Sequence, residues 1–425
     1  MILACALATS ALQAQETPRL TLAEVYGSLI GGSPRIAAAT AQAQAARARI
    51  GPASRWPDPS IQLSLMNRNL PGLGLQDPLG MNQIQVMQMV PIAGKTGLAV
   101  KAAQADATAE AARAREVSWE VRTRAAMSFY DIYQADHALT TMAETRRLVQ
   151  DIIETARVMY TEGRGRQTDV LRGQVDLARM DEEIIRMRAM REAMAVRLNS
   201  MRGLPVDAPV ATPLLPRFPD SLPSRQELEA HALGQRPMLA AGAARIEASD
   251  AMARRAGREI WPDLTLGVIY GQRPMPDGGT DRMGSFMLGF TLPLTAGSRQ
   301  RQMEAEAKAM NAMAIADLDD MRNDTRGRIG ELHADLRRAR ALAALYHTTL
   351  LPQIRATATA ALSGYRSGTA DFMTLLDSQM ESLRATQELF RFDAESGKAI
   401  AELEMLTATE LLDPASTADT PGGAP

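Results

Sequence analysis

The chain has 425 residues, 46% of them hydrophobic and 23% charged, which is the composition of a folded protein with a large core. Lysine and arginine total 47, aspartate and glutamate total 49, and both signs are interspersed along the chain. A nucleic-acid-binding protein would show a basic stripe and a high pI, so that class of function is excluded.

The first residues are typical of a secretory signal. An apolar run from Ile2 to Leu12 precedes Gln13-Ala14-Gln15, which predicts a signal peptide over 1–14, truncated because its basic leading segment is missing. The alternative is a lipoprotein acylated at Cys5, the only cysteine. Once the signal is removed, the mature chain has no disulfide and no cysteine ligand. No other stretch approaches the roughly 18 consecutive apolar residues of a membrane helix, so a membrane span would have to be a barrel.

Two halves of the chain carry the same motifs in the same order. Trp56-Pro57-Asp58 recurs as Trp261-Pro262-Asp263 after 205 residues, and Pro91 recurs as Pro293 after 202. The spacing of 205 also relates Tyr160, Gly163, Leu171 and Gln174 to Tyr365, Gly368, Leu376 and Gln379. We therefore expect two structural repeats. Their predicted bounds are 15–203 and 224–413, separated by a Pro-rich connector at 204–223 and followed by a flexible tail at 414–425.

Each repeat is predicted to contain, in order, a helix, a strand, a loop, a strand, a very long helix, a glycine break and a helix. Alternating residues predict two strand pairs, at 59–67 with 81–90 and at 264–272 with 284–292. Apolar side chains on one face and small or polar ones on the other are typical of membrane-barrel strands. With the apolar face toward lipid, three methionines fall on the presumed lumen face: Met87, Met89 and Met287.

The segments after the strand pairs are predicted to be unusually long helices. There is no internal proline from about 94 to 160, and only Pro352 from about 297 to 364. About 65 residues of α-helix would reach roughly 100 Å, which no compact globular domain needs. A 4,3 spacing in the first segment predicts coiled-coil packing through Val121, Ala125, Ser128, Ile132, Ala135, Leu139, Met142, Arg146, Val149, Ile153, Ala156 and Tyr160.

Four strands cannot close a membrane barrel, because the smallest closed ones have about eight and an open edge is not tolerated in lipid. Several chains must then share one barrel, whose wall the coiled-coil helices continue. The predicted fold class is a mixed α+β membrane protein: a long coiled-coil α-helical barrel continuous with a transmembrane β-barrel shared among subunits, with two structural repeats per chain.

Nearly the whole chain after the signal resembles the TolC-like family of outer-membrane efflux proteins. The resemblance is carried by the duplicated plan, the Trp-Pro-Asp strand entries, the segments around Gly163 and Gly368, and the strand exits Pro91-Ile92-Ala93-Gly94-Lys95 and Pro293-Leu294-Thr295-Ala296-Gly297. It implies a homotrimer with a twelve-stranded barrel in the outer-membrane lipid of a Gram-negative bacterium and a periplasmic helical barrel. It further implies a passive exit duct docked to a periplasmic adaptor protein and an inner-membrane pump.

The resemblance also assigns roles at the periplasmic tip, which follows each glycine. Among the expected gate residues, Asp377 matches one aperture aspartate and Thr374 stands where the second is expected. Thr168 and Asp169 match the partners of a latch arginine, but Ala370 occupies the arginine position, which implies a looser or different closure. The expected adaptor-docking residues are Gly163, Gly165, Gly368, Leu171 and Leu376.

A ring of three symmetry-related carboxylates at a constriction would favour cations and repel anions. For Asp169 the alternative to a gate role is a structural one, because a carboxylate in the first turn of a helix is stabilised by the helix dipole.

No enzyme site and no cofactor are predicted. The histidines at 137, 231, 333 and 347 are scattered, and no His/Cys cluster has metal-ligand spacing. No phosphate-binding glycine loop or nucleophile elbow is present, so the energy for transport must come from a partner.

The substrate class is left open between metal ions and drugs or other small molecules. Lumen thioethers are soft ligands suited to Cu(I), and the Pro91–Lys95 segment is similar to that of the family's heavy-metal branch. Most of the 25 methionines fall on predicted helices, where methionine is a routine gap-filler.

Two other classes compete with a channel. A periplasmic adaptor has a long helical hairpin, but it would need a β-rich lipoyl-like domain and only one hairpin. A soluble coiled-coil scaffold would leave the strand pairs unexplained. Solubility of the mature chain without detergent would favour either of them.

Overall fold

The computed structural model describes residues 19–66, 80–275 and 277–416. The predicted signal peptide at 1–14 with Cys5, most of the loop at 70–80 and most of the tail at 414–425 lie outside the described residues. The described residues form two compact units. Unit 1 takes them from Met1–Ile36, Ser118–Ala232 and Gly327–Pro425, and unit 2 from Ala37–Val117 and Leu233–Arg326. Both units therefore contain segments of both sequence repeats.

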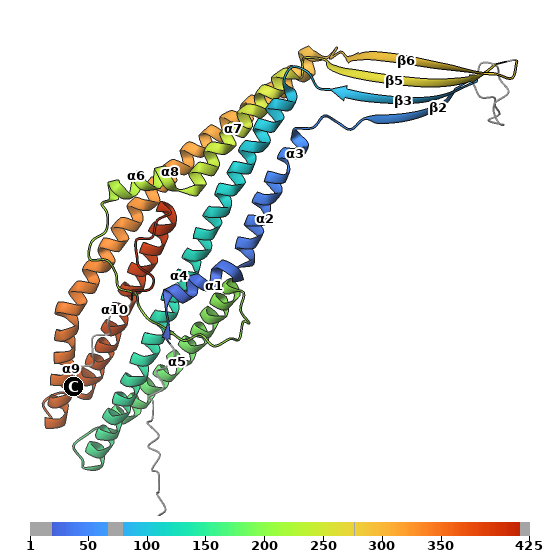
Figure 1. Cartoon of the computed structure of the whole chain (residues 1–425). Coiled ribbons are helices and arrows are strands. Elements are labelled where there is room, and N and C mark those ends of the chain that lie inside the picture. The colour runs from blue at the N-terminus through green and yellow to red at the C-terminus, as the bar shows by residue number, and fades with distance from the viewer. Residues whose placement is uncertain (1–18, 67–79, 276, 417–425) are drawn as a thin grey trace, which may run out of the picture. The chain divides into compact units, whose positions relative to one another are not determined.

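Unit 2 contains one antiparallel sheet of four strands in the order β2-β3-β5-β6 (Figure 1). The strands are β2 (Ser60–Met66), β3 (Met81–Val90), β5 (Asp263–Pro274) and β6 (Thr280–Thr291). The predicted strand pairs are confirmed, and β6 begins four residues earlier than predicted. The reason is a tight turn, in which Met275 N–H donates to the Gly279 carbonyl at 2.8 Å and Gly278 has a φ of 86°.

The two faces of the sheet differ in chemistry, as the alternation predicts. One face exposes Ile61, Leu63, Leu65, Ile84, Val86, Val268, Tyr270, Phe286, Leu288 and Phe290. The opposite face carries glutamine, serine, glycine and methionine. Phe286 is 71% exposed and Leu63 78%, so no other described part of the chain covers the apolar face.

The helices of unit 2 include α3 (Ile50–Ala53), α7 (Pro237–Arg258), most of α2 (Pro34–Ala48) and the first part of α4 (Lys95–Thr161). Arg236 begins α7 and donates its Nε to the buried Glu116 Oε1 at 3.1 Å. Glu116 Oε2 also accepts the backbone N–H of Met238 at 3.1 Å. One buried carboxylate on α4 therefore both neutralises Arg236 and satisfies a free donor at the start of α7.

Unit 1 contains the remainder of α4, with α1 (Leu22–Gly32), α5 (Gln167–Arg202), α9 (Leu351–Ser367) and α10 (Phe372–Thr407). Inside the predicted connector, β4 (Thr212–Pro213) pairs in parallel with β1 (Arg19–Leu20). The connector leads to α6 (Arg225–Gln235). Among the described residues no helix is sufficiently long and apolar to cross a membrane.

The first long helix is confirmed as α4, which has 67 residues. Its predicted seam is buried along unit 1 with three exceptions. Leu139 is partly buried, Arg146 is half-buried in an ion pair with Asp181, and Tyr160 is 43% exposed. The second long segment is helical but not uniform. It begins with the π-turn η1 (Ala296–Gln300) and α8 (Arg301–Leu345), and a second π-turn, η2 (Tyr346–Leu350), precedes Pro352 in the first turn of α9. A wider turn accommodates the proline, which lacks an N–H and would clash with the preceding turn.

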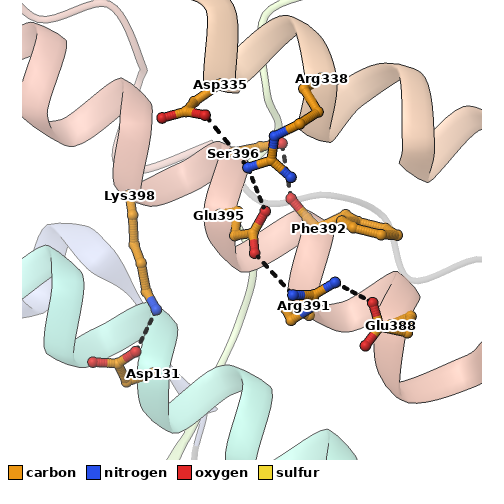
Figure 2. Close-up of polar contacts among 9 residues, drawn as sticks. All are labelled: Asp131, Asp335, Arg338, Glu388, Arg391, Phe392, Glu395, Ser396 and Lys398. Carbon is orange, nitrogen blue, oxygen red and sulfur yellow. Dashed lines mark hydrogen bonds and ion pairs between the residues drawn. The ribbon is translucent and has the colours of Figure 1, made fainter. Parts of the chain in front are cut away.

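Ion pairs join the helices of unit 1 in a network centred on α10 (Figure 2). Lys398 pairs with Asp131 of α4, and Arg338 of α8 donates to Glu395 at 3.3 Å. Arg328 of α8 forms a two-point pair with Glu402 at 2.6 and 2.8 Å. Since α10 pairs with both α4 and α8, these contacts fix the register of three helices.

Asp393 of α10 is partly buried beside this network. Burial raises its pKa to about 6, and the nearby His347 of η2 works in the opposite direction. A carboxyl group with this pKa changes charge close to physiological pH.

Candidate functional site: the helical tip and the sheet

Two turns form the tip of unit 1, and each contains a glycine with positive φ. Gly163 (φ 75°) follows α4, and Gly368 (φ 79°) is the C-cap of α9. The Arg164 and Gly165 N–H groups both donate to the Met159 carbonyl, at 2.8 and 3.0 Å. Thr369 and Ala370 donate in the same way to the Gly364 carbonyl, at 2.8 and 3.1 Å. The left-handed glycines thus let both turns satisfy the last carbonyls of their helices.

The predicted gate residues occupy the helix starts after these turns. Asp377 and Thr374 are exposed on the first turns of α10, and Thr168 is exposed at the start of α5. Asp169 is half-buried in the first turn of α5, where it helps to raise the pKa of Tyr365, an effect due mainly to burial of the phenol. Asp169 therefore lies near α9 of the second repeat and also occupies the helix-dipole position.

Sequence reasoning missed the residue that begins α10. Asp371 is its N-cap, and its Oδ1 accepts the Thr374 N–H at 2.6 Å. Hydrogen bonds from Thr374 lower the pKa of the Asp371 carboxyl, and the positive charge of Arg166 lowers it further. The signal in the sequence was an aspartate directly after the Gly-Thr-Ala turn and before an apolar run, which is typical of a helix start.

Arg166 belongs to the turn that contains Gly163, and its positive charge acts on Asp371, which follows the turn that contains Gly368. The position expected to hold an arginine is Ala370, whose methyl group packs against Gly364. The tip thus contains an arginine and an aspartate on opposite turns, with their order along the chain reversed relative to the expected latch.

The core beneath the tip is apolar and buried. It is made of Val149, Ile152, Ile153, Ala156, Met180, Ala361, Tyr365, Phe372, Leu375 and Leu376. Tyr365 and Phe372 meet edge to face at 5.8 Å. Leu376, expected at the docking surface, is only 2% exposed and belongs to this core, whereas Leu171 is 53% exposed on α5. The glycines Gly163 and Gly368 are exposed, and Gly165 is half-buried.

The three predicted lumen methionines lie on the polar face of the sheet. In the strand register Met87 lies opposite Gly267, which lies opposite Met287. A side chain at 267 would meet both methionines within 3.4 Å, so the glycine leaves room for them. Met89 is one step along the same face, opposite Thr265. In the described part of the chain no cluster of His, Cys, Asp or Glu could hold a metal ion.

A buried lysine joins the sheet to the helices of unit 2. Lys95, the last residue of the first strand-exit motif, is 5% exposed. Its Nζ donates to Asp263 Oδ1 at 2.9 Å and to the Trp261 carbonyl at 3.0 Å, and Glu259 Oε2 lies at 3.2 Å. The exit motif of one repeat therefore binds the Trp-Pro-Asp entry motif of the other, a pairing that neither motif predicts by itself.

Comparisons with solved structures show the same fold. The chain is 17% identical to the outer membrane protein VceC from Vibrio cholerae, with a TM-score of 0.75 over 92% of this chain and 96% of that one. It is 14% identical to the CmeC outer membrane channel of Campylobacter jejuni, with a TM-score of 0.76 over 93% and 87%. It is 15% identical to the open MtrE outer membrane channel of Neisseria gonorrhoeae, with a TM-score of 0.73 over 92% and 90%.

No curated protein sequence matches the chain. The model of the family described as outer membrane efflux protein matches it twice, over residues 25–204 and 229–409. The two matches confirm the duplicated plan. Since they cover most of the chain, the protein belongs to the outer membrane efflux protein family.

Proposed function

We propose that three copies of this chain assemble into one channel, with their sheets closing a shared barrel and their helices continuing it into the periplasm. As a member of its family the chain is an outer-membrane efflux channel. The observation that carries the assembly is the sheet. Among the described residues it has four strands, two edges that pair with no further strand, and one exposed apolar face. Four strands are about half of the smallest closed membrane barrel, so closure requires other copies.

The number of three rests on the resemblance to the family and gives twelve strands. The partners proposed on the same ground are a periplasmic adaptor protein and an inner-membrane pump. The adaptor function itself is disfavoured, because the described residues contain two strand pairs in one sheet and a long helical segment after each.

The tip is the proposed periplasmic gate. Asp377 and Asp371 present carboxylates at its surface, and threefold assembly would repeat each of them around one axis. Closely spaced carboxylates at a constriction favour cations. We place the latch at Arg166 and Asp371, on opposite turns, in place of the arginine that is absent at Ala370. Leu171 and the two turn glycines supply the exposed part of the docking surface.

The test is single-channel conductance of the detergent-extracted protein in planar bilayers. Asp377→Ala is expected to weaken cation selectivity, whereas Asp320→Ala, an exposed aspartate on α8, is expected to leave it unchanged. Asp371→Asn keeps an N-cap but removes the charge, so it should increase the open fraction if the latch is correct. Silent bilayers from a protein that stays soluble without detergent would reject the channel, and unchanged selectivity in Asp377→Ala would reject that gate residue.

One observation favours soft metal ions as a substrate class: Met87 and Met287 face each other across Gly267 on the proposed lumen face. Thioether sulfur binds Cu(I) and other soft cations. Ag(I) should therefore reduce the conductance of the wild type, and Met87→Leu with Met287→Leu should abolish the reduction. Met303→Leu, on α8, is the control. Equal reduction in all three proteins would leave drugs and other small molecules as the favoured class.

A further inference from the structure

The two hairpins of the sheet have equivalent registers once the repeat spacings are applied. The first strands of the repeats are related by 205 residues and the second strands by 202. These spacings convert the pair Leu63–Ile84 of the first hairpin into Val268–Phe286, which is the pair observed in the second. They likewise convert Ser60–Met87 into Thr265–Gly289, also observed. The repeat therefore relates the two hairpins residue by residue, down to which residues lie opposite each other.

The contact between the two hairpins is also known within the chain. Strand β3 pairs with β5, with Val86 opposite Val268 and Ile84 opposite Tyr270. In repeat terms this is the second strand of one repeat against the first strand of the next. In a closed ring of copies, a second strand would likewise meet a first strand at each junction between copies. There β6 of one copy would meet β2 of the next copy.

We propose that β6 of one copy pairs with β2 of the neighbouring copy in the register that the repeat dictates, with Leu288 opposite Leu63 of that copy. This inference rests on the proposed shared barrel. Converting the β3–β5 pairs by the same spacings also places Phe286 opposite the neighbouring Leu65, and Phe290 opposite the neighbouring Ile61. On the other face Met287 falls opposite Ser64, and Gly289 opposite Gln62.

The side chains at the proposed seam fit this arrangement. Each of the three apolar pairs joins a residue that is 53–71% exposed on β6 to one that is 63–78% exposed on β2. Aromatic and branched aliphatic residues that lie directly opposite each other stabilise antiparallel strands by about 0.2–1 kcal/mol per pair. A slip of one residue would place Phe286 opposite Ser64 and turn the apolar face of β2 into the lumen.

A slip of two residues keeps every side chain on its face, so hydrophobicity by itself does not exclude it. The repeat excludes it, because a two-residue slip at this seam would differ from the β3–β5 seam within the chain. A regular stagger is also required of a closed barrel, in which strand tilt and shear are linked.

Cysteine cross-linking can distinguish these registers. In a Cys5→Ser background, Leu288→Cys is combined in turn with Leu63→Cys, Leu65→Cys and Ile61→Cys, and the detergent-extracted protein is oxidised. Directly opposite residues have Cα atoms about 4.5–5.5 Å apart, within the range that a disulfide spans, whereas diagonal positions are about 7–8 Å apart. Val86→Cys with Val268→Cys is the matched control, since it is the equivalent pair within one chain and should form an internal disulfide under the same conditions.

The expected result is a covalent ladder that ends at the trimer for Leu63→Cys with Leu288→Cys, at least tenfold stronger than for the other two pairs. A stronger ladder with Leu65→Cys or Ile61→Cys, from protein that remains trimeric by native mass, would overturn the register and leave the shared barrel intact. Trimers without any ladder would overturn the β6–β2 contact. Monomers in every variant and in the wild type would overturn both the register and the proposed assembly.

Discussion

The tip of unit 1 and the sheet of unit 2 differ in the exposure of their large apolar side chains. At the tip Phe372 and Leu376 are 2% exposed and Leu375 is fully buried, all within one chain. On the sheet Phe286, Leu288 and Phe290 are all more than half exposed. The tip therefore gains its stability from packing inside a single chain, whereas in the proposed assembly lipid covers the apolar face of the sheet and other copies cover its edges.

The largest expected effect is at the tip. Phe372→Ala removes a buried ring that packs against Tyr365, so it should cost about 3–5 kcal/mol of stability. Hydrogen exchange of the purified protein would detect faster exchange in the α4 and α10 segments of the tip core. Glu381→Ala, an exposed change on the same helix, should have no such effect. Unchanged protection in Phe372→Ala would show that the tip core is not closed within one chain.

A charge on the apolar face of the sheet should have the next largest effect. Leu288→Arg places a guanidinium where lipid is expected, at a cost of about 2–4 kcal/mol near the membrane centre, so incorporation into membranes should fall. Ser285→Arg lies on the opposite face and should be incorporated nearly as well as the wild type. The measurement is the amount of heat-modifiable protein in the membrane fraction. Equal incorporation of both variants would contradict the assignment of the faces.

Lys95→Met tests the junction between the sheet and the helices of unit 2. The change leaves Asp263 and Glu259 without their shared cation, but both acids are partly exposed, so we expect a loss of about 1–3 kcal/mol. Thermal unfolding in detergent would measure it. Lys101→Met, an exposed lysine on the same helix, should be neutral. A neutral Lys95→Met would mean that water replaces the lysine.

The smallest effect is a pH dependence at Asp393, whose folded-state pKa of about 6 lies above its ordinary value. The folded chain holds this proton more tightly than the unfolded chain. Protonated Asp393 therefore stabilises the folded state fully below the ordinary pKa of 3.8, and this contribution to the free energy of unfolding is lost as the pH rises through about 6. Asp393→Asn should raise the Tm at pH 8 and leave it unchanged near pH 3. An equal shift at both pH values would rule out this titration.

The internal repeat predicted more than the arrangement of elements. It predicted both strand pairs, and it relates their registers residue by residue. It did not predict that equivalent residues have equivalent surroundings. Leu171 and Leu376 occupy the same place in their repeats, yet one is exposed and the other is buried against Tyr365 and Phe372. The second repeat contributes α9 and α10 to the tip core, and the first repeat contributes parts of α4 and α5, so the two halves of the tip are not interchangeable.

The proposed gate residues show the same limit of sequence-based prediction. The positions of Asp377, Thr374, Thr168 and Asp169 followed from the resemblance, and all four lie on the helix starts beside the tip turns. The cap at Asp371 and the charge of Arg166 beside it were not predicted. Their relation spans two turns about 200 residues apart in the chain, and no local pattern encodes it.

The sequence by itself determined the helix and strand periods, the apolar face of each strand, the length of α4 and the duplication. These properties depend on residues close together in the chain, or on copies of one pattern. Only the tertiary structure decided that Lys95 binds Asp263, that Leu376 is core, and that Arg166 lies near Asp371. Each of these arrangements depends on which helices and strands pack together. That packing is decided by the free energy of the whole fold, because distant segments compete for the same partners.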